Sequence, residues 1–230
     1  MLASVMTQMA PACMAESRNF DVPRFDTIAV ATGIRAEIEV GPPQSVRIEA
    51  QDPADFDDLV VEVHDGSLTL QFDSGERCCG QDPIRSHVEV VAYVTVPDVR
   101  GLRASSGASV EAAGVSADRL ELQTSSGARM RAAIARGPII EAAAANGTSL
   151  ALSGACGHLA ADVSSGASLS AADLACRSVA VTASSGASAT VFARDRAVAD
   201  ASSGASISVH GRPSATDIDT STGGSVAVRN

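Results

Sequence analysis

The chain has 230 residues and a formal net charge of −10, with 27 acidic residues against 17 arginines and no lysine. Such an acidic surface repels polyanions, which argues against nucleic acid and against an anionic membrane surface as partners. The sequence contains no run of 18 or more apolar residues, so we expect no transmembrane span.

Residues 1–19 differ in composition from the rest of the chain and are mildly apolar. The small residues Ala10 and Ala12, placed just before Cys13, resemble a signal-peptidase site. No basic residue precedes Arg18, so the basic start of an export signal is missing. We interpret the segment as a degraded or truncated export signal, and the alternative is a disordered tail.

Residues 20–100 are predicted to form an N-terminal β region that caps or extends the rest. Alternating apolar residues predict strands at 27–30, 34–38, 46–48, 59–63, 68–72 and 88–96. His64–Ser67 contains Asp-Gly and predicts a hairpin turn, and residues 51–58 predict a loop or a short helical turn. The loop at 75–83 carries Cys78 and Cys79, which with His87 form at most a partial metal site; a loop with oxidisable thiols is the stronger interpretation.

From residue 101 to residue 230 the motif Ser-Ser-Gly-Ala-Ser recurs, in four strict and three looser copies. Its glycines follow one another at intervals of 18 to 20 residues, a period that is typical of a solenoid. These glycines are Gly107, Gly127, Gly147, Gly166, Gly186, Gly204 and Gly223.

Apolar residues stand three and five positions after each of these glycines, as Val110 and Ala112 do after Gly107. This alternation predicts a strand after each glycine, and a second short strand precedes the next one. Stacking the copies gives an all-β fold, a single-stranded parallel β-helix of about seven coils. The coil length suggests three narrow sides.

Each repeat glycine is expected to supply a positive φ at a corner, and the flanking serines to form a ladder of hydroxyl hydrogen bonds between coils. A serine nucleophile is the competing interpretation. Seven near-copies of one motif argue against it, because an active site needs only one.

Equal positions in adjacent coils predict two contacts. Glu111 and Arg131 should form an exposed ion pair, since both lie four residues after their glycines. Cys156 and Cys176 both lie ten residues before the following glycine, close enough for a disulfide, and two reduced thiols are the alternative.

The last strand, 225–228, is expected to leave an open end that is either covered by a partner or paired with its own copy in a homodimer through the C-terminal coil. Arg229 could instead discourage pairing and keep the chain monomeric.

Patterns of a catalytic or metal site are weak. The histidines, His64, His87, His158 and His210, have no metal-finger spacing to cysteine, and the calcium-binding nonapeptide of β-rolls is missing. The aspartates of the repeats (Asp162, Asp173, Asp195, Asp200, Asp217 and Asp219) are expected to scatter around the coil. A ladder of outward serines would have the regularity of an ice-binding face but not its methyl groups.

The order of several motifs resembles the putative auto-transporter adhesin head domain, also called the GIN domain. The motifs run from Phe25-Asp26-x-Ile28-x-Val30-x-x-Gly33 through Val63-x-Asp65-Gly66-x-Leu68 and Val94-x-Val96-Pro97-x-Val99 to Leu102-x-x-Ser105-Ser106-Gly107. The resemblance covers about residues 20–230. It implies a right-handed β-helix in a bacterial protein that is periplasmic, at the cell surface or secreted.

We therefore expect a non-enzymatic envelope or secreted protein with an adhesin-like role, binding an envelope, glycan or protein ligand. No catalytic, cofactor-binding or metal-binding residue is expected. The alternatives are a self-assembling structural solenoid and, less favoured, a carbohydrate-active β-helix enzyme.

Overall fold

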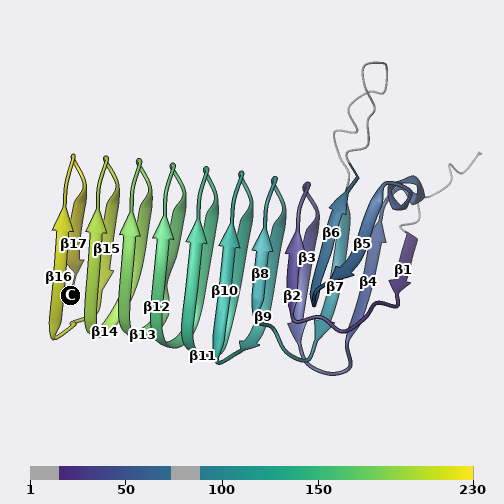
Figure 1. Cartoon of the computed structure of the whole chain (residues 1–230), viewed down its shortest axis with the longest axis horizontal. Helices are drawn as coiled ribbons and strands as arrows, with labels where there is room; N and C mark the ends of the chain where they lie inside the picture. Colours follow the sequence, from purple (N-terminus) through teal and green to yellow (C-terminus); the bar gives the residue numbers. More distant parts are fainter. Residues whose placement is uncertain (1–15, 74–88, 230) are drawn as a thin grey trace, which may run out of the picture.

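The structure, a computed structural model, describes residues 16–73 and 89–229 as a chain of strands with one 3₁₀ turn, η1 (Pro53–Phe56) (Figure 1). The strands are β1 (Glu16–Phe20), β2 (Thr27–Val30), β3 (Arg35–Val40), β4 (Ser45–Ala50), β5 (Leu59–His64), β6 (Ser67–Phe72), β7 (Val90–Val96), β8 (Gly101–Ala104), β9 (Ser109–Ser116), β10 (Arg119–Thr124), β11 (Arg129–Ala144), β12 (Ser149–Val163), β13 (Ser168–Ala183), β14 (Ser188–Ala201), β15 (Ser206–His210), β16 (Ala215–Thr220) and β17 (Ser225–Arg229). The predicted all-β solenoid is confirmed.

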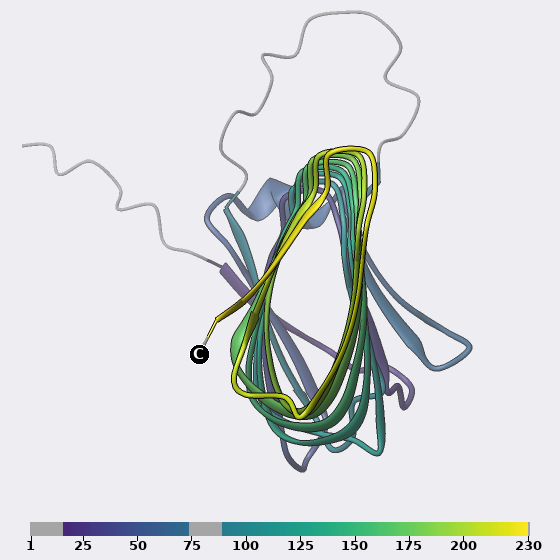
Figure 2. The ribbon, with the colours of Figure 1, turned by 90° about the vertical axis from the view of Figure 1, so that its left-hand side faces the viewer.

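Each coil has two sides, which face each other across the core (Figure 2). One side, sheet I, stacks β6, β2, β8, β10, the second halves of β11–β14 and β16; the other, sheet II, stacks β7, β3, β9, the first halves of β11–β14, β15 and β17. All of these pairings are parallel. The expected three-sided coil is wrong, because the turn that contains the glycine reverses the chain within two residues.

That turn has the same conformation in every repeat. Ser185 and Gly186, for example, both have positive φ, 54° and 71°, and Ala187 donates its N–H to the Ser184 carbonyl oxygen at 3.1 Å. Two successive residues with positive φ define the type I′ turn, which matches the twist of the strands on either side. All seven repeat glycines have positive φ, as expected from the sequence.

Main-chain hydrogen bonds tie neighbouring turns together. The Gly186 N–H donates to the Ser203 carbonyl oxygen of the next coil at 3.0 Å, and the same bond recurs along the stack. Within residues 16–73 and 89–229, the turn hydroxyls form no ladder of hydrogen bonds between coils. The expected serine ladder is therefore wrong: serine tolerates the turn, and the backbone makes the contacts between coils.

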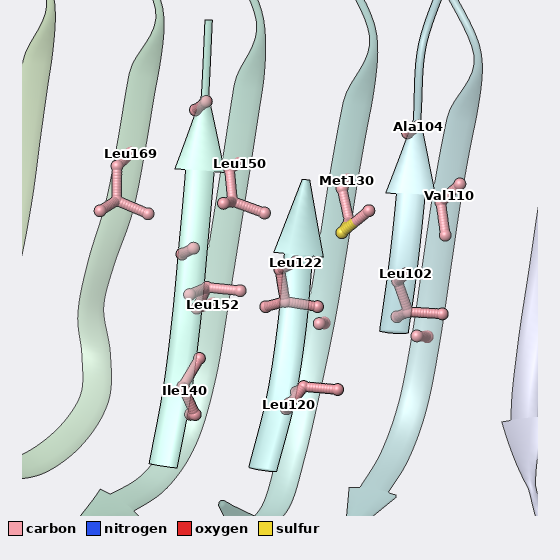
Figure 3. Packing of buried hydrophobic residues seen from close by; sticks show 14 of the residues in the cluster. Leu102, Ala104, Val110, Leu120, Leu122, Met130, Ile140, Leu150, Leu152 and Leu169 are labelled. Carbon is pink, nitrogen blue, oxygen red and sulfur yellow. The ribbon is translucent and has the colours of Figure 1, made fainter. Parts of the chain in front are cut away.

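The core is a set of rows that run along the solenoid axis. The residues three and five positions after each glycine point inward, and Leu150, Met130 and Val110 in three neighbouring coils are at most 1% exposed (Figure 3). On the opposite side Leu120 and Leu122 stack on Ile140 and its neighbours. Burial of these rows supplies the main stabilisation, since each short strand buries its apolar face only against the next coil.

The N-terminal region both extends and caps the stack. Strands β2 and β3 form a coil that lies between β8–β9 on one side and β6–β7 on the other. Its turn, Thr32-Gly33, has the same positive φ values as the repeats, and Gly33 donates to the Ser106 carbonyl oxygen at 3.0 Å. An eighth turn of the stack thus comes from a segment that lacks the repeat motif.

Antiparallel strands close this end of the solenoid. Strand β4 pairs with β7, β1 pairs with β4, and β5 pairs with β6. Residues 16–19, which the sequence assigned to the signal-like segment, are part of β1; the rest of that segment lies outside the described residues.

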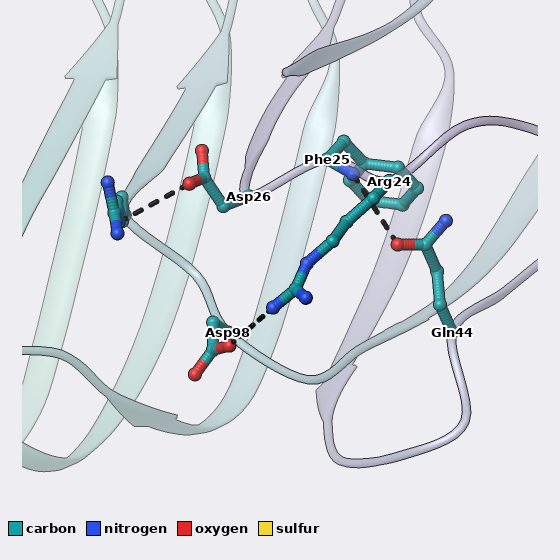
Figure 4. A network of polar contacts seen from close by, with 6 residues as sticks. Arg24, Phe25, Asp26, Gln44 and Asp98 are labelled. Carbon is teal, nitrogen blue, oxygen red and sulfur yellow. Dashed lines mark hydrogen bonds and ion pairs between the residues drawn. The ribbon is translucent and has the colours of Figure 1, made fainter.

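Several side-chain contacts hold residues 24–26, which lie between β1 and β2 in the chain (Figure 4). Arg24 pairs with Asp98 at 3.2 Å and Arg100 pairs with Asp26 at 3.3 Å. The Phe25 N–H donates to the Gln44 side-chain oxygen at 3.4 Å. The two ion pairs join the N-terminal coil to the segment that leads into the first repeat, although the paired residues are about 75 positions apart in sequence.

Candidate functional site

A groove lies on the outer face of sheet II. It has a volume of about 590 Å³ and crosses β7, β3, β9, β11, β12 and β13. Its outward-facing lining combines acidic, small and hydroxyl side chains with a single arginine and a single tyrosine: Glu37, Glu39, Tyr93, Thr95, Glu111, Ala113, Arg131, Ala133, Ala151, Ser153, Ser170 and Asp173.

Strand alternation and local bulges produce this groove. Large side chains stand on β3, β7 and β9, whereas the repeats β11–β13 contribute mainly alanine and serine. The pairing of β9, β11, β12 and β13 changes register near Ile134 and Ala171, next to the lining residues Ala133 and Asp173. Bulges of this kind bend a strand, so they curve the sheet beside the lining residues.

One wall of the groove is a row of three charged side chains and one tyrosine in register. Tyr93, Glu37, Glu111 and Arg131 lie on four adjacent strands. Arg35, just beside this row, lies 3.5 Å from the Glu37 carboxylate and 3.9 Å from that of Glu111. It therefore offsets part of the repulsion between the two glutamates.

The register of Glu111 and Arg131 is as the repeat predicts, but the ion pair between them is not formed. The Glu111 carboxylate turns toward Arg35 on the other neighbouring strand, which the repeats alone could not reveal. Within the described residues Arg131 has no ion-pair or hydrogen-bond partner. Its guanidinium is exposed in the groove and is available to a ligand.

Tyr93 is partly covered at the end of this row. The guanidinium of Arg47 lies 4.5 Å from the centre of its ring, a cation–π contact, and Arg47 also pairs with Glu49. One face of the ring is thus occupied, and Tyr93 is also one of the residues that line the groove.

A second hollow, of about 690 Å³, lies where the coils bend between sheets I and II. It is lined by charged residues that already have partners. Within the lining, Arg119 pairs with Glu141 and Arg136 with Asp118 at 3.4 Å. The lining residues Asp98, Arg100 and Glu121 pair with Arg24, Asp26 and Arg103, which lie outside it. Exposed pairs of this kind stabilise a surface only slightly and leave few free groups for a ligand. The groove on sheet II is therefore the better candidate site.

Cys156 and Cys176 are partners in register on β12 and β13, and the structure joins them in a disulfide with a Cα–Cα distance of 4.4 Å. Cys176 is fully buried. The bond links two adjacent coils on the side of the bend. Cys78, Cys79 and His87 lie outside the described residues.

The remaining histidines lie apart. His158 Nδ1 is 2.9 Å from the Ser178 hydroxyl, His64 Nε2 is 3.2 Å from the Asp65 carboxylate, and His210 ends β15. Among residues 16–73 and 89–229, no group of three or more His, Cys, Asp or Glu could hold a metal ion. In the same ranges, no helix has the length and apolarity needed to span a membrane.

The aspartates of the repeats do not all scatter. Asp162, Thr182, Asp200 and Asp219 form one row on the outer face of sheet I. The three aspartates lie four residues before the following glycine, and the strand that enters each turn is held in register by that turn. The expectation of scatter was wrong for these three, because coil length varies at the bend and positions counted from the preceding glycine therefore do not align.

Sequence reasoning missed the contribution of Glu37, Glu39, Tyr93 and Thr95 to the groove. Glu37 and Glu39 alternate with buried residues in β3, which marks them as outward-facing. No feature of the sequence, however, shows that β7 pairs on β3 and so brings Tyr93 beside them.

Comparison with known proteins supports this architecture. The family model described as "Putative auto-transporter adhesin, head GIN domain" matches residues 24–213. A search of curated proteins finds no match.

Solved structures share the fold at low identity. A crystal structure of a putative adhesin from Bacteroides fragilis has a TM-score of 0.81 at 16% identity, covering 95% of this chain and 99% of that one. A putative lipid binding protein from Parabacteroides distasonis (TM-score 0.66, 16% identity, 94% and 97% coverage) and a putative adhesin from Parabacteroides merdae (0.66, 14%, 94% and 96%) are also similar. Because the family model covers most of the chain, this protein belongs to the family of the putative auto-transporter adhesin head GIN domain.

Proposed function

We propose that this protein is a non-enzymatic, adhesin-like binding protein of the bacterial envelope, cell surface or extracellular space, and that it holds its ligand in the groove on sheet II. The family description and the names of two similar structures, each called a putative adhesin, support the binding role. The Cys156–Cys176 disulfide supports an oxidising compartment, since such bonds persist outside the reducing cytosol.

The observation that carries the proposal is Arg131, which has no partner among residues 16–73 and 89–229 and lies in a groove lined mainly by carboxylates, hydroxyls and alanines. Arginine and carboxylate side chains together can donate to and accept from neighbouring hydroxyl groups. Four acidic residues against one arginine disfavour an anionic ligand. The ligand class that fits best is therefore a neutral glycan.

The test is binding of the full chain to a glycan array and to purified envelope components, followed by titration of the best binder. Arg131→Ala and Glu111→Gln should each weaken binding about tenfold or more, because each removes a charge-assisted hydrogen bond. Arg129→Ala is the matched control: it removes an exposed arginine from the same strand, two residues from Arg131 and outside the lining.

Equal weakening by the Arg129 control, or no glycan binding at all, would contradict the proposal. Preferential binding to anionic lipid vesicles would also overturn it, because the acidic lining should repel them. Release of reducing sugar from a bound glycan would identify an enzyme instead of an adhesin.

A further inference from the structure

Among residues 16–73 and 89–229, no strand pairs on the outer edge of the coil formed by β16 and β17, and the core is open at that end. Each of these strands pairs on one side only, β16 with β14 and β17 with β15, within the described part of the chain (Figure 1). Ile218 and Val228 are 44% and 41% exposed, whereas the residues in register with them in the preceding coil, Ala199 and Val209, are fully buried. The apolar rows of the core therefore continue into solvent at this end.

The existing hydrogen bonds determine which main-chain groups are free at this edge. The Ser221 N–H bonds to the Ala201 carbonyl oxygen, and the Ser225 N–H bonds to that of Ala205. In a parallel pair, amide groups point alternately to the two sides of a strand. The amides of Ile218 on β16 and of Val226 and Val228 on β17 therefore point away from the solenoid, toward an additional strand.

We propose that a second copy of this chain docks on this end, with β16 of each copy antiparallel to β17 of the other. A two-fold axis along the long dimension of the coil produces this arrangement and places the tight turns of the two copies on each other. The same strand pairing then forms twice, once in each sheet, as an isologous interface requires. The proposal does not depend on the groove or its ligand.

Charge selects both the partner strand and the register. When Ile218 lies opposite Val228 of the second copy, their outward-pointing amides face each other, and Asp217 lies opposite Arg229 of the second copy. A shift by two residues, with Ile218 opposite Val226, leaves Asp217 opposite an alanine. The other two-fold arrangement pairs β16 with β16 and sets Asp217 and Asp219 against acidic residues of the second copy, which is unfavourable. Only the β16–β17 arrangement gives opposite charges, and it gives them twice.

The test is sedimentation of the full chain over a concentration series, with charge-swap variants. Wild-type protein should dimerise. Asp217→Arg and Arg229→Asp should each raise the dimer dissociation constant about tenfold or more, because each places like charges in contact at two symmetric positions. The double variant, which restores opposite charges in reversed order, should recover most of the wild-type affinity.

Asp162→Arg serves as the matched control, since it changes the same kind of exposed aspartate on sheet I away from this end, and it should leave the dimer unchanged. A wild-type monomer at the highest soluble concentration would overturn the proposal. Failure of the double variant to recover would do the same. If Asp217→Arg instead strengthens association and Arg229→Asp leaves it unchanged, the β16–β16 arrangement is the real one and the proposed register is wrong.

Discussion

Replacement of Gly186 by valine tests the turn that organises the solenoid. Gly186 has φ of +71°, and a Cβ added there meets no atom within 4 Å. The cost is therefore one of backbone conformation alone. Placing an L-residue in the left-handed region costs about 1–2 kcal/mol, and a β-branched side chain should fall at the upper end.

For a chain of this size, each kcal/mol lowers the melting temperature by about 2–4 °C. Gly186→Val should therefore melt about 2–8 °C below wild type when unfolding is followed by circular dichroism. Ser188→Val is the control, because it adds the same side chain on an exposed position of β14, where valine favours the strand. An unchanged melting temperature for Gly186→Val, or an equal loss in the control, would refute the reasoning.

Three further expectations concern other coils. Gly154→Ala should destabilise the protein more than Gly186→Val does, by more than about 2 kcal/mol in chemical denaturation. The added Cβ would lie 1.9 Å from the Ile134 carbonyl oxygen of the neighbouring coil. A smaller loss of stability would mean that the bulge beside Ile134 relaxes freely. In protein exported to the periplasm, Cys156 and Cys176 should resist alkylation until a reductant is added, and free thiols before reduction would contradict the disulfide. Replacing both cysteines with alanine should lower the free energy of unfolding by up to about 3 kcal/mol, as expected for a loop of this length. Asp200→Asn should raise the free energy of unfolding by about 0.2–1 kcal/mol at low salt and by less at high salt, because it relieves repulsion from Asp219 on the next strand. A gain in stability that does not depend on salt would contradict this reason.

The sequence by itself determined the period of the solenoid, its inward rows and the register between adjacent repeats. Each follows from local chemistry: the repeat glycine supplies a left-handed residue at a fixed place, and strand alternation assigns Leu150 to the inside and Glu111 to the outside. Equal offsets from the glycine likewise brought Cys156 and Cys176 together. Such features depend on neighbours that the repeat itself specifies.

The shape of the coil and the make-up of the groove were decided only by the tertiary structure. A period of 18 to 20 residues is compatible with two or three sides, and the type I′ turn, with serine in a left-handed conformation, made it two. The coil of β2 and β3 inserts between β7 and β9 through pairings between distant segments. Those pairings set Glu37 between Tyr93 and Glu111 and turned Glu111 toward Arg35, so that Arg131 has no partner in the part of the chain that the structure describes. No local pattern encodes these contacts, because each depends on which strand lies next in space and not on which comes next in the chain.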